Sequence, residues 1–299
     1  MRRLVAVASV ALAAVPAAHA GGTQAGVVAA RGRVWALAGG SAVELDRTSG
    51  RIVRSVRGRY PFATALAFGG GSVWLSSVEN GFVSGSVTRI PPSGRITSPL
   101  VLPGRPVFAL ASDGSSAWAL VGPWRDPRLA RIDGVRVRTF SSHGVGFLTS
   151  GAGAVYGLTS WGTVIRIAHD GRAHVLARLR GADGPPVAGA GSLWVPRGST
   201  LVRLDPRDGR TLGILRLGGS ASSLVFSGDT AWAAVLHHDA FRLERLDPRT
   251  MRVTAARTIP NRAPQLSYGN GALWLADGDL RVWRVDPRTL ARRLFAQLD

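Results

Sequence analysis

The sequence contains no cysteine and no lysine, and only three of its residues are glutamate. The lack of cysteine excludes disulfides and the attachment of a lipid to an N-terminal cysteine. A chain of 299 residues can bury enough apolar surface to fold without such cross-links. Arginine supplies all 37 basic residues against 18 acidic ones, which gives a net charge of +19. A compositional bias would explain why arginine replaces lysine, but it does not explain the shortage of acidic residues. The charge is therefore also consistent with a protein that binds an anionic polymer, such as nucleic acid, an acidic glycan or an anionic envelope surface.

Long hydrophobic runs are lacking after the first twenty residues. Arg2 and Arg3 precede an uncharged run at residues 4–15, and a small-x-small triplet, Ala18-His19-Ala20, follows it. This pattern predicts a cleavable export signal over residues 1–20, because a membrane span needs about 20 apolar residues. A buried core helix is the alternative, and the arginine pair leaves the twin-arginine route open beside the general one. We expect a secreted or periplasmic protein, or one on the exterior of the cell envelope, cleaved near Ala20 and with no transmembrane segment in its mature chain.

The mature sequence also lacks any amphipathic helix of ten or more residues, and it has an internal repeat instead. An aromatic residue follows a glycine-containing turn and one small apolar residue at seven places, which are 38 to 44 residues apart. This spacing is the period of β-propeller blades. We call these residues the landmark aromatics: Trp35, Trp74, Trp118, Tyr156, Trp194, Trp232 and Trp274.

Each repeat carries a second pattern, in which an arginine lies between apolar residues just before a turn. Six repeats have the arginine, and the first has Glu44 in its place. The turn is most complete at Asp205-Pro206-Arg207-Asp208-Gly209. There aspartate accepts backbone N–H groups, proline presets φ and glycine supplies a left-handed residue, as a hairpin loop requires. We interpret the arginines as structural, because a residue that repeats with the blade serves every blade alike: Arg89, Arg131, Arg166, Arg203, Arg245 and Arg284.

These patterns predict an all-β protein, a seven-bladed β-propeller of four-stranded antiparallel blades over residues 21–299. We name the strands a to d from the axis outward; in the second repeat they are expected at residues 63–68, 72–77, 87–90 and 95–102. The mature chain begins with an a strand near residues 26–29 and ends with a d strand near residues 292–298. Each blade then comes from one continuous segment, so we expect no strand exchange between the termini. We also expect a monomer.

The two faces of such a propeller differ in this sequence. The a–b turns are rich in glycine and the c–d turns are the aspartate hairpins, so the a–b/c–d face is expected to be structural. Longer loops with unusual chemistry fall on the d–a/b–c face, where we predict the binding site. Its tryptophans lie outside the landmark register, so they either stack on a ligand or pack over a neighbouring blade. The candidate ligand-binding residues are Trp124, Arg125, Trp161, Arg197, Arg59 and Arg105.

Carboxylates and imidazoles on the same face could hold a divalent metal. Two alternatives remain open: adjacent histidines in a loop commonly lie in solvent, and Asp277-Gly278-Asp279 also fits a turn. No cofactor is predicted, although a divalent metal is possible. The candidate metal ligands are Glu79, Asp126, His237, His238, Asp239 and Asp277.

The repeat resembles two related groups of exported seven-bladed propellers, the YVTN-repeat (YncE-like) group and the streptogramin lyase (virginiamycin B lyase-like) group. The resemblance rests on Leu-Val-Arg-Leu-Asp-Pro-Arg-Asp-Gly-Arg at residues 201–210 and Gly-Ser-Leu-Trp-Val at residues 191–195, and it covers nearly all of residues 25–299. It implies the fold. The catalytic histidine of the lyases precedes a landmark aromatic by eleven residues, and His143 is out of that register here. The equivalent positions hold Ala63, Val107, Val145, Asp183, Ala221 and Ala263.

The glutamates that the lyases place after the landmark aromatic are also missing, so the activity is not carried over. We therefore expect an exported, non-catalytic binding module that uses its d–a/b–c face for a protein, a glycan or another anionic envelope ligand. The alternative is a lyase-like or lactonase-like metal-dependent enzyme at the mouth of the channel.

Overall fold

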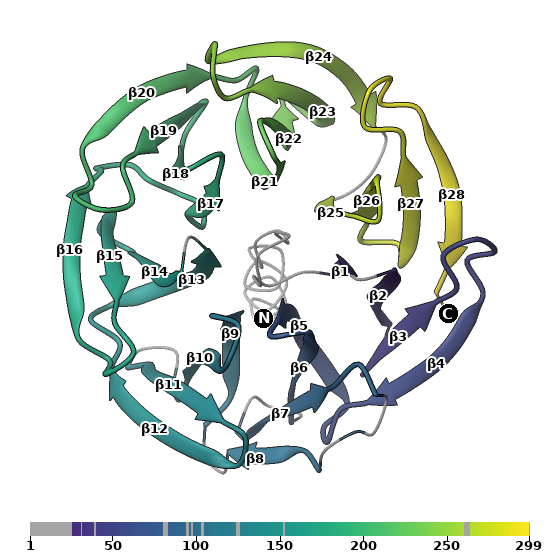
Figure 1. The fold of residues 1–299 in the computed structure, drawn as a ribbon, viewed down its shortest axis with the longest axis vertical. Helices are drawn as coiled ribbons and strands as arrows, with labels where there is room; N and C mark the ends of the chain where they lie inside the picture. The colour runs from purple at the N-terminus through teal and green to yellow at the C-terminus, as the bar shows by residue number, and fades with distance from the viewer. Residues whose placement is uncertain are drawn as a thin grey trace, which may run out of the picture.

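The computed structural model describes residues 26–30, 32–38, 40–79, 83–93, 96, 98–102, 105–123, 126–151, 153–259 and 264–298. The predicted export signal lies outside these residues. The described chain forms seven four-stranded antiparallel sheets in a ring around a central axis (Figure 1). The prediction of an all-β, seven-bladed propeller is confirmed. Within the described residues, no helix is long and apolar enough to cross a membrane.

Each blade uses four consecutive strands, with the first nearest the axis and the fourth outermost (Figure 1). The a strands are β1 (Val27–Ala30), β5 (Phe62–Gly69), β9 (Val107–Ser112), β13 (Val145–Gly151), β17 (Val187–Gly189), β21 (Ser220–Ser227) and β25 (Gln265–Gly269). The b strands are β2 (Arg33–Ala38), β6 (Ser72–Val78), β10 (Ala117–Val121), β14 (Ala154–Thr159), β18 (Ser192–Arg197), β22 (Thr230–His237) and β26 (Ala272–Ala276). The c strands are β3 (Ser41–Leu45), β7 (Gly85–Ile90), β11 (Arg128–Asp133), β15 (Thr163–Ile167), β19 (Thr200–Leu204), β23 (Ala240–Asp247) and β27 (Arg281–Val285). The d strands are β4 (Ile52–Arg57), β8 (Leu100–Leu102), β12 (Arg136–Ser141), β16 (Ala173–Arg178), β20 (Thr211–Arg216), β24 (Arg252–Ile259) and β28 (Arg292–Gln297).

The b strands are buried on both faces because a neighbouring blade packs on each side of the sheet. Every residue of β6, β10 and β14 is buried. Such strands are largely apolar in sequence, whereas most residues of the outer strand β24 are exposed. The outer strand of the second blade, expected at residues 95–102, covers Leu100–Leu102 in the described chain.

The landmark aromatics lie in the core, as predicted. Trp118, Trp194 and Trp274 are among the largest fully buried side chains of the described chain. Trp194 contacts the ring of Phe226 in the next blade with 5.5 Å between ring centres, and Trp232 contacts Tyr268 in the next blade in the same way. Trp118 and Trp274 instead contact a phenylalanine ring on the outer strand of their own blade. The repeat therefore places one large ring where two blades meet, which fills the wedge between their sheets.

The ring closes by packing rather than by strand exchange, as predicted. β1–β4 form the first sheet and β25–β28 the last. Val27 and Ala29 belong to the same buried cluster as Trp274 and Phe295. Backbone N–H groups of the first blade also donate to side chains of the last, with 3.1 Å between Ala29 N and Ser267 Oγ.

Candidate functional site

Three of the repeated arginines join neighbouring blades. Arg203 on β19 lies opposite Trp194 on β18, and its guanidinium stands 5.5 Å from the centre of that indole ring. The guanidinium also donates hydrogen bonds to Ser192 Oγ (2.8 Å) and to the carbonyl of Pro248 in the next blade (3.2 Å). The structural interpretation is confirmed here, and we call this arrangement the blade clamp. Two other blades make the same link, from Arg131 to the His169 carbonyl and from Arg245 to the Arg288 carbonyl.

The first blade builds the clamp from different residues. Glu44 lies opposite Trp35, and Arg54 on β4 lies opposite Glu44 with 2.9 Å between their charged groups. The Arg54 guanidinium stands 4.9 Å from the Trp35 ring centre, so a cation still covers the indole. Arg33 pairs with Glu44 at 3.1 Å and reaches the Pro92 carbonyl of the second blade at 3.2 Å. The charge reversal at Glu44 is therefore compensated by arginines on the two adjacent strands.

The c–d hairpins have the predicted chemistry. Asp205 Oδ1 accepts the Arg207 N–H at 2.8 Å, and Gly209 is left-handed with φ 74°. Two hairpins lack the glycine, and Met251 and Leu290 take the left-handed position with φ 58° each. Hydrogen bonds from backbone N–H groups at the turn hold the pKa of three of these aspartates below its usual value: Asp46, Asp247 and Asp286.

The most exposed aromatic side chain of the described chain lies on the predicted d–a/b–c face. Trp161, in the turn between β14 and β15, is 85% exposed, so it does not pack over a neighbouring blade. The turn is fixed by the β16–β17 connection, since Leu179 N donates to the Gly162 carbonyl at 2.7 Å. Exposed Arg180 follows directly in that connection. The indole is therefore presented to solvent by a turn with a defined backbone.

Arg197 lies on the other side of the same connection. It ends β18, and a methyl group placed on Gly181 would lie 3.9 Å from its Cγ atom. The turn after Arg197 is tied to the connection, because Gly198 N donates to Asp183 Oδ2 at 3.1 Å. The structure thus brings Trp161, Arg180 and Arg197 to one part of the rim, and we call these three residues the Trp161 surface.

The other predicted ligand contacts are more scattered. Arg59 and Arg105 are exposed and belong to the d–a connections that lead into β5 and β9. Trp124 and Arg125 lie outside the described residues. Further exposed apolar side chains occur in segments of the d–a/b–c face: Phe62 (48%), Val83 (59%), Leu236 (41%) and Leu280 (43%).

The candidate metal ligands do not gather in the part of the chain that the structure describes. No group of three or more histidine, aspartate or glutamate side chains there could hold a metal ion. Asp277 is buried, and its carboxylate accepts the N–H groups of Asp279 and Arg281, at 3.0 Å each, and the Trp283 indole N–H at 2.9 Å. This is the turn that the sequence left open as an alternative. The remaining candidates belong to loops of three different blades: Glu79, Asp126, and the trio His237, His238 and Asp239.

One buried carboxylate on this face was not predicted. Glu244 on β23 is 2% exposed, and its Oε2 atom has no hydrogen-bond partner in the described chain. A methyl group on Gly218 would lie 3.0 Å from Glu244 Oε1, 3.4 Å from Arg242 Nη1 and 3.5 Å from His237 Cδ2, so these side chains surround Gly218. Burial raises the pKa of Glu244, although Arg242, the Gly218 N–H and His237 oppose the rise.

A groove lies on the opposite, a–b/c–d face, which the sequence predicted to be structural. It has a volume of about 470 Å³ and is lined by residues of blades 3, 4 and 5. We call it the blade-4 groove, because most of its lining residues belong to the strands and turns of blade 4. Its polar lining is Asp113, Arg166, His169, His174, Arg207 and Asp208.

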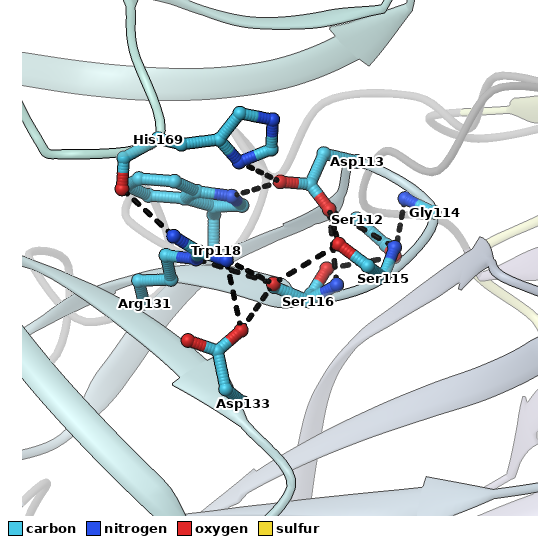
Figure 2. A network of polar contacts seen from close by, with 9 residues as sticks. All are labelled: Ser112, Asp113, Gly114, Ser115, Ser116, Trp118, Arg131, Asp133 and His169. Carbon is cyan, nitrogen blue, oxygen red and sulfur yellow. Dashed lines mark hydrogen bonds and ion pairs between the residues drawn. The ribbon is translucent and has the colours of Figure 1, made fainter.

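Figure 2 shows the blade-3 end of this groove. Asp113, whose side chain is 3% exposed, accepts hydrogen bonds from the Trp118 indole (2.8 Å) and the Ser116 N–H (2.9 Å), and it lies 3.3 Å from His169 Nδ1. Burial alone would raise the pKa of Asp113, but hydrogen bonds from Trp118, Ser116 and Ser115 outweigh it, so the pKa lies below its usual value. The Asp113 carboxylate is therefore occupied by protein donors.

The residues that the sequence analysis missed are exceptions to the repeat. Glu244 holds a c-strand position where the other repeats carry only uncharged residues. Blade 4 has Tyr156 where the other six repeats have tryptophan, and Ala168 where the hairpins of blades 5, 6 and 7 have aspartate. A position-by-position comparison of the seven repeats gives these signals.

The fold and these sites define a seven-bladed β-propeller with irregular chemistry on both faces. No family model matches the chain, and no curated protein sequence matches it. Solved structures do match: dihydro-heme d1 dehydrogenase NirN in complex with DHE has a TM-score of 0.65 at 14% identity, over 92% of this chain and 67% of that one. The computationally designed Ika8 protein has 0.64 at 15%, over 95% and 92%. Apo AztD from Citrobacter koseri has 0.59 at 10%, over 90% and 84%. At these identities the similarity shows the fold alone.

Proposed function

We propose that this chain is an exported, non-catalytic propeller that binds an anionic envelope ligand, foremost an acidic glycan, through the Trp161 surface. The observation that carries this proposal is the exposure of Trp161, which is 85% accessible between two segments that carry arginine. Tryptophan and arginine are the residues that most often dominate the energy of a binding surface. An exposed indole on a fixed turn has little other structural purpose.

The chemistry of the surface favours an acidic glycan. The flat face of an indole offers an apolar platform for a sugar ring, and guanidinium groups pair with carboxylate, sulfate or phosphate in a planar fork. Arg180 and Arg197 belong to the segments tied to the Trp161 turn, while Asp183 between them accepts the Gly198 N–H. The net charge of +19 for the whole chain would draw an anionic polymer towards the protein.

The proposal also includes export and kinship. The pattern of residues 1–20 supports cleavage near Ala20, and the propeller architecture is compatible with kinship to the YVTN-repeat and streptogramin lyase-like groups. Export is tested by expressing the full chain and measuring the mass of the secreted product. A product that begins at Gly21 supports it, and retention of the full mass in the cytoplasm contradicts it.

Binding is tested with heparin and polygalacturonate as acidic glycans and dextran as a neutral one. We expect the acidic glycans to bind and dextran not to bind, with an affinity that falls steeply as salt is raised. Trp161→Ala and Arg197→Gln should each weaken binding roughly tenfold. Arg172→Gln is the matched control: Arg172 lies in the c–d turn of blade 4, on the opposite face, and its side chain is 82% exposed.

Three results would overturn the proposal. The first is equal binding of dextran and the acidic glycans. The second is equal weakening by Arg172→Gln and Arg197→Gln, which would show a diffuse charge effect and no defined surface. The third is the absence of glycan binding; a protein ligand captured through Trp161 would then replace the glycan.

A further inference from the structure

Two of the repeated arginines, Arg166 in blade 4 and Arg284 in blade 7, make no hydrogen bond to a described residue of the next blade. Arg284 still covers its landmark ring, with its guanidinium 5.9 Å from the Trp274 ring centre. Arg166 holds the repeated position in blade 4, opposite Tyr156, yet its side chain is exposed and makes no hydrogen bond or ion pair with any described residue. The equivalent Arg131 and Arg203 each reach a carbonyl in the next blade. The guanidinium of Arg166 is close enough to Tyr156 to oppose the rise in the pKa of its hydroxyl, so it stays near the sheet. Arg166 is also one of the residues that line the blade-4 groove.

The groove is open because blade 4 carries smaller side chains at this junction. In blade 7 the outer strand has Phe295 at an irregularity in its pairing with β27, and that ring packs on Trp274 with 4.7 Å between ring centres. Blade 4 has the same irregularity in β16, but its residue there is Leu176. In both blades the c–d turn of the next blade lies against this residue. A methyl group on Gly50 would meet the Phe295 carbonyl oxygen, and one on Gly209 would meet the Leu176 carbonyl oxygen. Exchange of a phenylalanine for a leucine beneath that turn leaves space.

The groove combines cationic groups with an apolar wall. Arg166 and His174 are direct cross-strand partners, which places their Cβ atoms about 5 Å apart. Arg207, from the hairpin of blade 5, is exposed at the same groove. Leu176 supplies an apolar wall. Two acids line the groove: Asp208 accepts the Arg210 N–H within its own turn, and Asp113 is held by the Trp118 indole and the Ser116 N–H.

We propose that the blade-4 groove binds a small organic anion with an aryl or alkyl body, its acidic group on Arg166 and Arg207 and its body against Leu176. Two arginines and a histidine suit a carboxylate, phosphate or sulfonate. A volume of about 470 Å³ lies within the range of small-molecule sites. This site is independent of the Trp161 surface, because it lies on the opposite face of the ring.

The test is equilibrium titration of the purified protein with phenyl phosphate, benzoate and benzenesulfonate, with benzyl alcohol as the neutral analogue. We expect at least one of the three anions to bind with one-to-one stoichiometry and benzyl alcohol not to bind. Arg166→Gln should weaken anion binding at least about tenfold, as loss of a charge-assisted hydrogen bond does. Leu176→Phe should abolish binding by filling the groove while both arginines remain. Arg172→Gln, in the adjacent turn but outside the groove, should change the affinity less than about twofold.

Each contrary result decides against the site. If none of the three anions binds at millimolar concentration, the proposal fails. If Arg172→Gln weakens binding as much as Arg166→Gln, the anion is attracted by the general positive charge. If Leu176→Phe binds like the original protein, the anion lies elsewhere. Far-ultraviolet circular dichroism and thermal melting show whether each variant keeps the fold, and Tyr156→Trp gives a second route to restore the side chain of the other blades.

Discussion

The same substitution at two equivalent positions should have very different effects on stability. Arg203 and Arg166 occupy the same place in neighbouring blades, each opposite a landmark aromatic. Replacement by methionine keeps much of the aliphatic stem and removes the guanidinium. In Arg203→Met the variant loses the bonds to Ser192 and Pro248 and the cation over Trp194. In Arg166→Met no hydrogen bond to a described residue is lost.

The size of the difference follows from these contacts. A hydrogen bond to a charged group contributes about 1.5–3 kcal/mol, and a partly exposed cation–π contact about 0.5–1 kcal/mol. Because Arg203 is half-buried, we expect Arg203→Met to cost about 2–3 kcal/mol in total. Arg166→Met should stay within about 0.5 kcal/mol, as surface substitutions do. The larger cost corresponds to a melting temperature lower by roughly 4–12 °C.

Urea denaturation of the two variants beside the original protein measures the difference directly. Equal slopes of free energy against urea concentration show that the denatured states are comparable. A loss for Arg166→Met that equals the loss for Arg203→Met would refute the reasoning, because it would mean that blade 4 is clamped like blade 5. That result would also remove the basis for a ligand contact at Arg166.

Three further predictions concern single side chains. The pKa of Glu244 lies above its usual 4.5, so its ionisation destabilises the fold as the pH rises through the folded-state pKa. Glu244→Gln should therefore be about 1 kcal/mol more stable than the original protein at pH 7 and equally stable at acid pH. A difference in stability that does not change with pH would contradict this. The pKa of Asp113 lies below its usual 3.8, so the ionised carboxylate stabilises the fold. Asp113→Asn should cost about 1 kcal/mol at neutral pH, and this loss should shrink as the pH falls through the folded-state pKa. Urea titrations that show the same loss at every pH would contradict it. Gly50 and Gly32 are both left-handed, but a Cβ at Gly50 would lie 1.9 Å from the Phe295 carbonyl oxygen, whereas one at Gly32 would have no described residue other than its chain neighbours within 4 Å. Gly50→Ala should therefore cost about 1–3 kcal/mol more than Gly32→Ala. Similar melting temperatures would mean that this contact does not help to close the ring.

The fold could be predicted because its signals are local and recur seven times. A landmark aromatic such as Trp194 and a hairpin such as residues 205–209 each follow from short-range rules of burial and turn geometry. Ring closure without strand exchange followed from the phase of the repeat at the two ends of the chain. The first-blade clamp could not be predicted in this way, because Arg54 becomes the partner of Glu44 only through the pairing of β3 with β4.

The candidate sites were harder to predict because they depend on how exceptions meet in space. Trp161 was singled out as lying outside the landmark register, and its 85% exposure settles the alternative that it packs over a blade. The blade-4 groove was missed because its face was judged from the regular hairpins alone. Arg166 also looked like five other arginines in sequence, and it differs from them in the structure by its exposed side chain.

Blades 1 and 4 differ in how they treat the clamp, and the difference bears on what Arg166 does. In blade 1 the repeated arginine is absent, yet Arg33 and Arg54 rebuild both the cation over the indole and the link to the next blade. In blade 4 the arginine is present, yet the link is not made by it. A repeat protein is stabilised by the sum of its interfaces, so a junction that lacks this hydrogen bond is tolerated. The Arg166 guanidinium is not used in packing, so it can contact a ligand in the groove without weakening the ring. A repeated residue that lacks the contacts of its equivalents is therefore a good place to look for binding.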